Sequence, residues 1–294
     1  MELIEQVAFQ GHGGINLAAD ARGPMDGAAV LMLHGGGQTR GAWNAAADAL
    51  AARGFRVITL DLRGHGESDW SPDGHYMLER FADDLRDVIA QIGGAPVLVG
   101  ASLGGLSSML ACGEAPHAPL SALVLVDIVP KMERSGGDHV VGFMRGTKDG
   151  FDNLEQAADA IAGYLPHRPR PRSLDGLSKN LRQAEDGRYY WRWDPAFVKP
   201  RDNWDPDATS RRLSAAAQAI DAPILMVRGT KSEIVSEDAL RHFRELLPEA
   251  EVAEIADARH MVAGDDNDAF LGAILNFVAR HAAQPTIEGS RQHG

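Results

Sequence analysis

Residues 96–105 read PVLVGASLGG and place a serine between a short apolar run and a pair of glycines. The apolar run Val97–Gly100 predicts a strand that is buried on both faces, as in a parallel sheet covered by helices. A helix-like stretch, Leu103–Gly113, follows directly. Small neighbours let a strand and a helix pass closely through a sharp turn, which leaves the hydroxyl of Ser102 exposed above the sheet. This stretch therefore predicts an α/β fold with a serine nucleophile.

Similar apolar runs and helix-like stretches alternate along most of the chain. The further runs that predict strands lie at 28–33, 56–60, 123–126, 224–227 and 250–255. The further stretches that predict helices lie at 43–53, 78–92, 236–247 and 268–282. This alternation predicts a doubly wound, mostly parallel sheet. We expect the core of this α/β domain to span 1–130 and 220–284.

The alternation is interrupted between residues 131 and 219. Amphipathic pieces occur there at Leu154–Tyr164 and Leu174–Ala184, followed by the aromatic stretch YYWRWDPAF, and no apolar strand run is present. We expect residues 131–219 to form a mainly helical lid (cap) over the carboxyl ends of the strands, where ligands bind in such sheets. The polar, aperiodic tail 285–294 is expected to be disordered.

The composition limits the classes of partner. The chain has 294 residues and a formal net charge of −12, from 29 Lys and Arg against 41 Asp and Glu. An acidic surface repels phosphate backbones and anionic headgroups, so we expect neither a nucleic-acid nor a membrane partner. The single cysteine, Cys112, cannot form an internal disulfide, and no signal-peptide pattern opens the chain. A cytoplasmic location is expected, and the oligomeric state is not predicted.

A second glycine-rich motif, His34-Gly35-Gly36-Gly37, follows the run 28–33. An acyl-transfer enzyme needs donors where the oxyanion forms, and glycines bring backbone amides there without side-chain obstruction. We expect the oxyanion hole to consist of the amides of Gly36 and Leu103, with Gly37 as an alternative to Gly36. A phosphate-binding loop is the competing interpretation, but no Lys-Ser/Thr or GxGxxG spacing follows. His34 is expected to support this loop.

His260 lies after the last predicted strand and before the final predicted helix. A general base must carry a proton near neutral pH and reach the serine from a different loop, and a late histidine at the end of a strand can do both. The chain has 11 histidines, so the position and not the residue type carries this prediction. We expect His260 to be the catalytic base.

These motifs, together with DLRGHGES at 61–68, resemble the α/β-hydrolase superfamily over roughly Val7 to Ala282. The segment 61–68 is typical of lid-bearing members related to esterases, lactonases, haloalkane dehalogenases, epoxide hydrolases and cofactor-free haloperoxidases. The dehalogenases and epoxide hydrolases of this fold have an aspartate at the nucleophile position, where this chain has Ser102. An alkyl ether on serine could not be hydrolysed as their ester intermediate is, so the resemblance implies acyl chemistry.

The resemblance leaves two positions open for the acid of the triad. Most members carry the acid after the late strand, where this chain offers Glu233, and some carry it one strand after the nucleophile, where this chain offers Asp127. Small esterases with a similar VDIxP segment often lack an acid at the Glu233 position, which slightly favours Asp127. Other relatives have SD where this chain has SE, which favours Glu233. Asp61 and Glu67 are interpreted as residues that stabilise a turn.

The expected function is hydrolysis of a carboxylic ester or lactone of a small to medium apolar substrate, without a cofactor, since no metal, nucleotide or flavin motif is visible. Phe143, Tyr164 and Trp191 are expected to line the substrate pocket. Further aromatic and apolar candidates are Met144, Tyr189, Tyr190, Trp193 and Phe197. The alternatives are a carbon–carbon bond hydrolase or a perhydrolase with the same triad, and a non-catalytic small-molecule sensor on the same scaffold.

Overall fold

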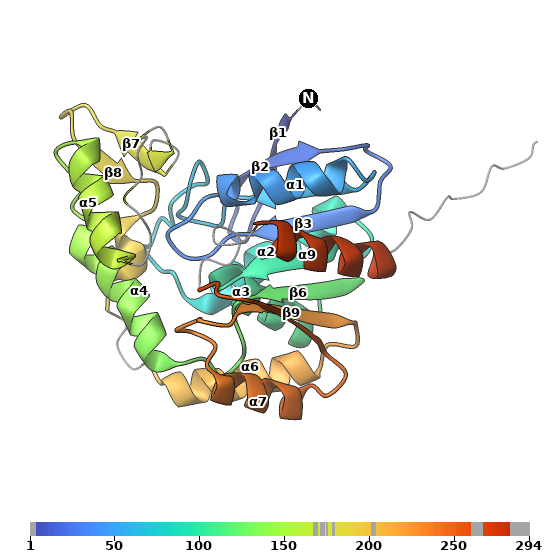
Figure 1. Cartoon of the computed structure of the whole chain (residues 1–294). Coiled ribbons are helices and arrows are strands. Elements are labelled where there is room, and N and C mark those ends of the chain that lie inside the picture. The colour runs from blue at the N-terminus through green and yellow to red at the C-terminus, as the bar shows by residue number, and fades with distance from the viewer. Residues whose placement is uncertain are drawn as a thin grey trace, which may run out of the picture.

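The computed structural model (Figure 1) describes residues 4–166, 170, 174, 176–177, 180–200, 204–259 and 267–282. The described residues form an eight-stranded sheet in the order β1-β2-β4-β3-β5-β6-β9-β10. Its strands are β1 (Glu5–Gln10), β2 (Asn16–Arg22), β3 (Ala29–Leu33), β4 (Arg56–Leu60), β5 (Val97–Ala101), β6 (Ala122–Val126), β9 (Ile224–Gly229) and β10 (Glu251–Ile255). Strands β1 and β2 are antiparallel to their neighbours, and the others are parallel.

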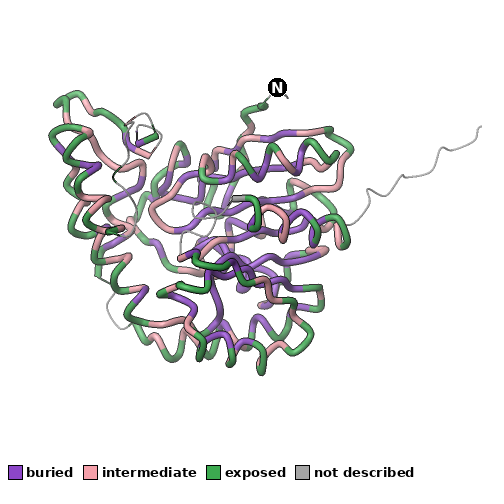
Figure 2. Tube along the Cα trace, viewed as in Figure 1, coloured by how far each residue is buried: buried purple, intermediate pink, exposed green. Residues whose placement is uncertain are grey.

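Helices cover both faces of this sheet. The helices are α1 (Asn44–Ala51), α2 (Leu78–Ile92), α3 (Leu103–Gly113), α6 (Pro206–Gln218), α7 (Glu237–Leu246) and α9 (Asn267–His281). One apolar cluster joins the sheet to α2, α3, α6 and α7, and a second joins the opposite face to α1 and α9. Figure 2 shows that the buried residues are concentrated in the strands between these layers. This arrangement confirms the expected doubly wound α/β fold.

The predicted strands and helices are present, with bounds that differ by a few residues at most. The antiparallel pair β1 and β2 was not predicted. Its exposed strand β1 has no buried residue and β2 alternates polar and apolar side chains, so neither forms the continuous apolar run that marks a strand covered on both faces. None of the described helices is long and apolar enough to span a membrane.

The segment after β6 forms a layer beside the sheet edge, at the left of Figure 1. It contains α4 (Arg134–Thr147), α5 (Leu154–Tyr164), the 3-10 helix η3 (Pro195–Val198) and an antiparallel pair, β7 (Leu181–Gln183) and β8 (Tyr189–Trp191). Helix α5 lies where the sequence predicted it. The strand β7 lies where an amphipathic piece was expected, because Gly187, at φ 81°, turns the chain into a hairpin that the aromatic residues of β8 stabilise.

The expected lid segment, 131–219, includes residues 206–218, where no helix was predicted; these residues form α6, which packs against α3. Leu213, Ala216 and Ala217 are buried in the apolar cluster of α2 and α3. The contact is close because a Cβ atom at Gly113 would lie 2.0 Å from the carbonyl oxygen of Ala216. Residues 206–218 lie within the interruption in the alternation of apolar runs and helix-like stretches, so their position in the sequence could not distinguish a core helix from a lid helix.

The register of the central strands brings four connecting segments together. Leu33 pairs with Gly100, and Ala101 pairs with Val126, which pairs in turn with Val227. The residues that follow β3, β5, β6 and β9 therefore emerge at one edge of the sheet. Ligands bind at this carboxyl edge in open α/β sheets.

Candidate active site

Ser102 occupies a strained turn between β5 and α3. Its backbone has φ 45° and ψ −111°, a left-handed conformation that non-glycine residues rarely adopt. The neighbouring glycines are required by contact, since a Cβ atom at Gly100 would lie 2.5 Å from the nitrogen of Gly105. A Cβ atom at Gly104 would lie 2.5 Å from the carbonyl oxygen of Leu33. Such strain persists where the surrounding structure enforces it, and it is common at catalytic residues.

The loop after β3 leaves one of its amides without an acceptor. The amide of Gly35 donates to Oε1 of Gln38 at 3.0 Å, and the amide of Gly37 donates to Nε2 of His65 at 3.1 Å. The Gly36 amide between them makes no hydrogen bond with a described residue. Gly37 is therefore not a free substitute, and Gly36 is the member of the loop that can receive an oxyanion. Leu103 begins α3, so its amide has no acceptor within the helix.

His34 is buried behind this loop in its neutral form. Its Nδ1 lies 2.8 Å from the carbonyl oxygen of Gly35, and its Nε2 accepts the amide of Leu62 at 3.0 Å. Nε2 is therefore the acceptor and Nδ1 carries the proton. Burial lowers the pKa of His34 to about 4, which keeps the ring neutral at physiological pH. As predicted, His34 supports the oxyanion loop and fixes the carbonyl of Gly35.

His65, in the DLRGHGES segment, also supports the loop after β3. Its Nδ1 lies 2.9 Å from the carbonyl oxygen of Arg63, while its Nε2 accepts the amide of Gly37. Burial and the neighbouring His34 lower the pKa of His65 to about 3. A protonated His65 would lose the lone pair that holds Gly37, so the neutral state preserves the shape of the loop. The sequence analysis assigned no role to His65, although its place in the motif was visible.

Asp61 and Glu67 stabilise the turn, in agreement with their interpretation from the sequence. Asp61 is fully buried and accepts the amide of Arg40 at 2.6 Å and that of Glu67 at 3.0 Å. The guanidinium of Arg40 pairs with the carboxylates of both residues. These contacts join the segment after β4 to the residues that follow the oxyanion loop.

Asp127 lies in the turn directly after β6 and is fully buried. It also has a left-handed backbone, with φ 48°, and its amide donates to the carbonyl oxygen of Val227 at 2.7 Å. Its Oδ1 accepts the amide of Gly229 at 3.3 Å, and its Oδ2 accepts the hydroxyl of Ser232 at 2.6 Å. The carboxylate is therefore held in one orientation at the carboxyl edge.

Glu233 has a different environment. Its side chain is 49% exposed and forms an ion pair with Arg259. The predicted base, His260, lies outside the described residues. What the structure does establish is that Asp127 is buried and fixed by protein donors, whereas Glu233 faces solvent beside the residue that precedes His260.

A cavity of about 380 Å³ opens beside Ser102. Phe143 and Tyr164 stack with ring centroids 4.3 Å apart, and Trp191 meets Phe143 at 6.1 Å, so the three predicted pocket residues form one aromatic wall of this cavity. The other walls are formed by Gly35, Gly36, Gly37, Gln38, Thr39, Gly41, Ala42, Trp43, Ala101, Val126, Val140, Met144, Gly176, Asn180 and Trp193.

Not every predicted aromatic residue reaches the cavity. Of the described candidates, Tyr189, Tyr190 and Phe197 do not line it. Phe197 instead packs behind the oxyanion loop, 4.9 Å from the ring of His65. Gln38 and Ser232 orient the site but were missed, because a polar side chain that bonds to a loop leaves no periodic pattern in the sequence. Within the described ranges, no group of three or more His, Cys, Asp or Glu residues is arranged to hold a metal ion.

Comparisons with known proteins agree with this geometry. A sequence model of the alpha/beta hydrolase fold matches residues 28–266. Esterase Rv0045c of Mycobacterium tuberculosis is 30% identical over 217 residues, 71% of this chain and 68% of the relative. The sn-1-specific diacylglycerol lipase ABHD11 of Mus musculus is 29% identical over 261 residues, 85% of this chain and 81% of the relative.

A solved structure, that of E-2-(acetamidomethylene)succinate hydrolase, superposes with a TM-score of 0.79 at 26% identity. The match covers 94% of this chain and 100% of that one. The strained serine turn, the glycine loop and the mostly parallel sheet are thus found together with a family match that spans most of the chain. The chain belongs to the α/β-hydrolase family.

Proposed function

We propose that this protein is a serine hydrolase that cleaves a carboxylic ester or lactone of a small to medium apolar substrate. The observation that carries the proposal is the left-handed turn at Ser102, which opens into a cavity beside an amide without an acceptor. The names of the esterase and lipase relatives support an ester-acting hydrolase. Hydrolysis of an ester and of a lactone uses the same acyl chemistry, so the proposal includes both.

In the proposed cycle, His260 removes the proton of Ser102 as the hydroxyl oxygen attacks the substrate carbonyl. The amides of Gly36 and Leu103 donate to the oxyanion that forms. When the tetrahedral intermediate collapses, the bond to the leaving oxygen breaks and His260 returns the proton to that oxygen. Water then attacks the acyl-enzyme with His260 as the base, which releases the acid and restores Ser102.

We assign the acid of the triad to Asp127 and not to Glu233. An acid that orients a histidine must be fixed and shielded from water, because its negative charge stabilises the imidazolium most strongly in a low dielectric. Asp127 is fully buried, and its carboxylate accepts hydrogen bonds from the amide of Gly229 and the hydroxyl of Ser232. Glu233 is half exposed and already paired with Arg259.

The aromatic wall of the cavity indicates the substrate class. Phe143, Tyr164 and Trp191 present aromatic surface, and Nε1 of Trp191 is already bound to the hydroxyl of Thr147 at 3.0 Å. This wall therefore offers contact area and few unbound polar groups, which suits an apolar acyl or alcohol group. A volume of about 380 Å³ fits a small to medium substrate.

The test is intact-mass spectrometry after exposure to a fluorophosphonate, with hydrolysis of p-nitrophenyl acetate and butyrate followed in the same samples. We expect one adduct on the wild-type protein and none on Ser102→Ala, with turnover reduced by about three orders of magnitude or more. Ser214→Ala is the matched control, since that hydroxyl bonds only to the carbonyl of Ser210 in α6.

Each result has a different meaning. Loss of both the adduct and the turnover in Ser102→Ala alone supports the proposal. An adduct without turnover of either ester would instead indicate a non-catalytic sensor on the same scaffold. The absence of any adduct, or equal labelling of Ser102→Ala, would show that this turn is structural and that the proposal is wrong.

A further inference from the structure

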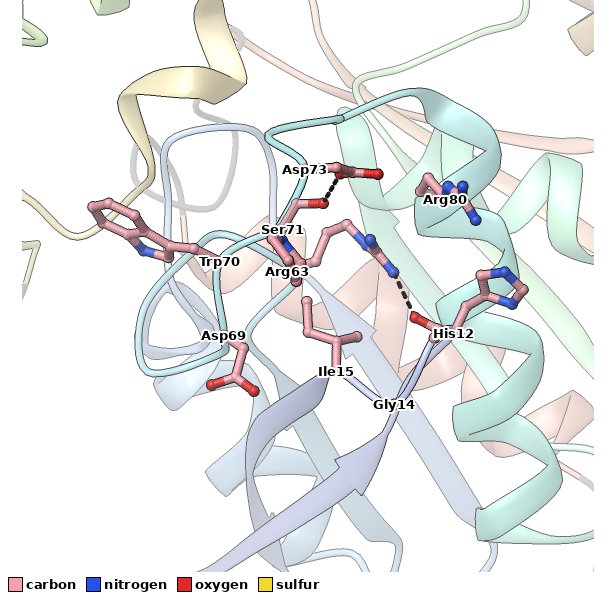
Figure 3. Close-up of a pocket in the computed structure, with 11 residues that line it drawn as sticks. His12, Gly14, Ile15, Arg63, Asp69, Trp70, Ser71, Asp73 and Arg80 are labelled. Carbon is pink, nitrogen blue, oxygen red and sulfur yellow. Dashed lines mark hydrogen bonds between the residues drawn. The ribbon is translucent and has the colours of Figure 1, made fainter.

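A second cavity lies at the same edge of the sheet, under the turn between β1 and β2. Its volume is about 550 Å³, and Figure 3 shows the side chains around it. It is lined by His12, Gly13, Gly14, Ile15, Arg63, Asp69, Trp70, Ser71, Pro72, Asp73 and Arg80. None of these residues lines the cavity beside Ser102. We call it the arginine cavity, and the proposed ester hydrolysis makes no use of it.

Arg63 is a buried cation that has one guanidinium nitrogen without a hydrogen bond to a described residue. The residue is only 4% exposed, and its Nε and Nη2 bind the carboxylate of Asp84 at 2.6 and 2.5 Å. Nη2 also donates to the carbonyl oxygen of His12 at 3.2 Å. The third nitrogen, Nη1, makes no hydrogen bond with a described residue, although Arg63 lines the cavity. Its two N–H donors are therefore available to a ligand.

Arg80 is a second available cation on the same cavity. It is half-buried in the first turn of α2, and its guanidinium has neither an ion pair nor a hydrogen bond within the described part of the chain. Its charge acts on the carboxylate of Asp73, whose pKa is lowered by hydrogen bonds from His75 and Ser71 and, to a smaller extent, by Arg80. Figure 3 places Arg80 and the imidazole of His12 on the same side of the cavity.

The opposite side of the cavity has a different chemistry. Figure 3 places Trp70 and Asp69 there, and Trp70 is 43% exposed. Asp69 accepts the amide and the side-chain nitrogen of Asn16 on Oδ2. Asp73, which Figure 3 shows between Ser71 and Arg80, accepts the hydroxyl of Ser71 on Oδ1. Each carboxylate keeps lone pairs that can accept from a ligand hydroxyl. The two sides together suit a molecule with an anionic end and a hydroxylated body.

We propose that the arginine cavity binds a small polyhydroxylated organic anion. The phosphate or carboxylate group is held by Nη1 of Arg63 and the guanidinium of Arg80, because the planar guanidinium of arginine binds both kinds of oxyanion through paired donors. The hydroxyl groups donate to Asp69 and Asp73, and the apolar face of the ligand lies on Trp70. The two carboxylates repel a bare anion, so the hydroxylated body is required for binding.

The test is isothermal titration calorimetry of the full chain at fixed ionic strength. Ribose 5-phosphate and gluconate are the probes, because they carry a phosphate and a carboxylate on similar hydroxylated bodies. We expect saturable binding of at least one probe, and weakening of about tenfold or more in Arg80→Ala, which removes a charge-assisted contact. The matched control is Arg53→Ala, whose guanidinium, among the described residues, bonds only to the carbonyl of Ala49.

Arg63→Lys is a second variant, since it keeps a cation beside Asp84 but removes the free nitrogen of the guanidinium. Weakening in both Arg63→Lys and Arg80→Ala, with Arg53→Ala unchanged, supports the site. Tighter binding of ribose 5-phosphate identifies a phosphate ligand, and tighter binding of gluconate identifies a carboxylate ligand. No saturable binding of either probe, or the same affinity in Arg80→Ala as in the wild type, overturns the proposal. Binding by Ser102→Ala keeps this result separate from the proposed hydrolysis.

Discussion

The turn after β6 and the loop after β9 each carry one carboxylate, but only the first is enclosed. Asp127 is fully buried and receives two hydrogen bonds from the loop after β9, from the amide of Gly229 and the hydroxyl of Ser232. Glu233, one residue after Ser232, is 49% exposed and pairs with Arg259. The loop after β9 therefore positions an acid that belongs to another strand.

This difference arises between two loops that lie side by side. The two loops are adjacent because β6 and β9 are neighbours in the sheet. A carboxylate from either loop enters the same region, and the other loop is then free to supply hydrogen-bond donors. A buried, hydrogen-bonded carboxylate interacts strongly with a nearby cation, whereas an exposed ion pair contributes little.

The largest effect is expected for Asp127→Asn. An amide cannot stabilise the imidazolium and permits the wrong tautomer of the base, so we expect a fall in kcat of about three to four orders of magnitude. The measurement is hydrolysis of p-nitrophenyl butyrate, with circular dichroism to show that the fold is retained. A loss of less than tenfold in a folded variant would exclude Asp127 as the acid of the triad.

We expect the pH dependence of stability to come from the buried histidines His34 and His65. The loops that carry Asp127 and Glu233 are not expected to contribute to it. The pKa of His34 is lowered to about 4 and that of His65 to about 3 in the folded protein. In the unfolded chain a histidine has a pKa near 6.5, so below that pH the unfolded state binds more protons than the folded state. Stability therefore falls with decreasing pH, by about 2 kcal/mol per histidine between pH 6.5 and 5.

Urea unfolding at the two pH values checks this expectation. The decrease should remain in Asp127→Asn and in Glu233→Gln, because neither variant changes a histidine. It should shrink by about half in His65→Gln. A decrease that disappears in Asp127→Asn would mean that the loop after β6 dominates the pH response.

A smaller effect is expected for Ser232→Ala, which removes the donor to Oδ2 of Asp127. The hydroxyl also accepts the amides of Ile234 and Val235, so the variant loosens the loop after β9 as well. We expect kcat to fall about tenfold with little change in KM, since Ser232 does not line the cavity beside Ser102. Ser232→Thr keeps the hydroxyl and should restore most of the activity. Failure of Ser232→Thr to recover would indicate that packing, and not the donor, is responsible.

The smallest effect is expected for Glu233→Gln. The exposed pair with Arg259 is screened by water, so kcat should change by about threefold or less. The comparison variant is Asp127→Asn, measured under the same conditions. A thousandfold loss in Glu233→Gln with an active Asp127→Asn would reverse the assignment of the two carboxylates.

The sequence by itself determined the α/β class and the serine turn. The apolar runs of β3, β4, β5, β6 and β9 identify buried parallel strands because both of their faces must be apolar, and the glycines around Ser102 identify a turn that side chains would block. The exposed hairpin of β1 and β2 and the short pair β7 and β8 left weaker patterns. Helix α6 was not predicted, and its packing against α3 became visible only in the structure.

Only the tertiary structure decided how the site is held together. Asp127 and Glu233 each follow an apolar strand, and nothing in the spacing of either residue reveals which one is enclosed. Likewise, the sequence could not separate Gly36 from Gly37, because the decisive fact is that His65, from a distant loop, accepts the amide of Gly37. Burial and hydrogen bonding depend on residues that are far apart in the chain, so they become defined only when the sheet brings its loops to one edge.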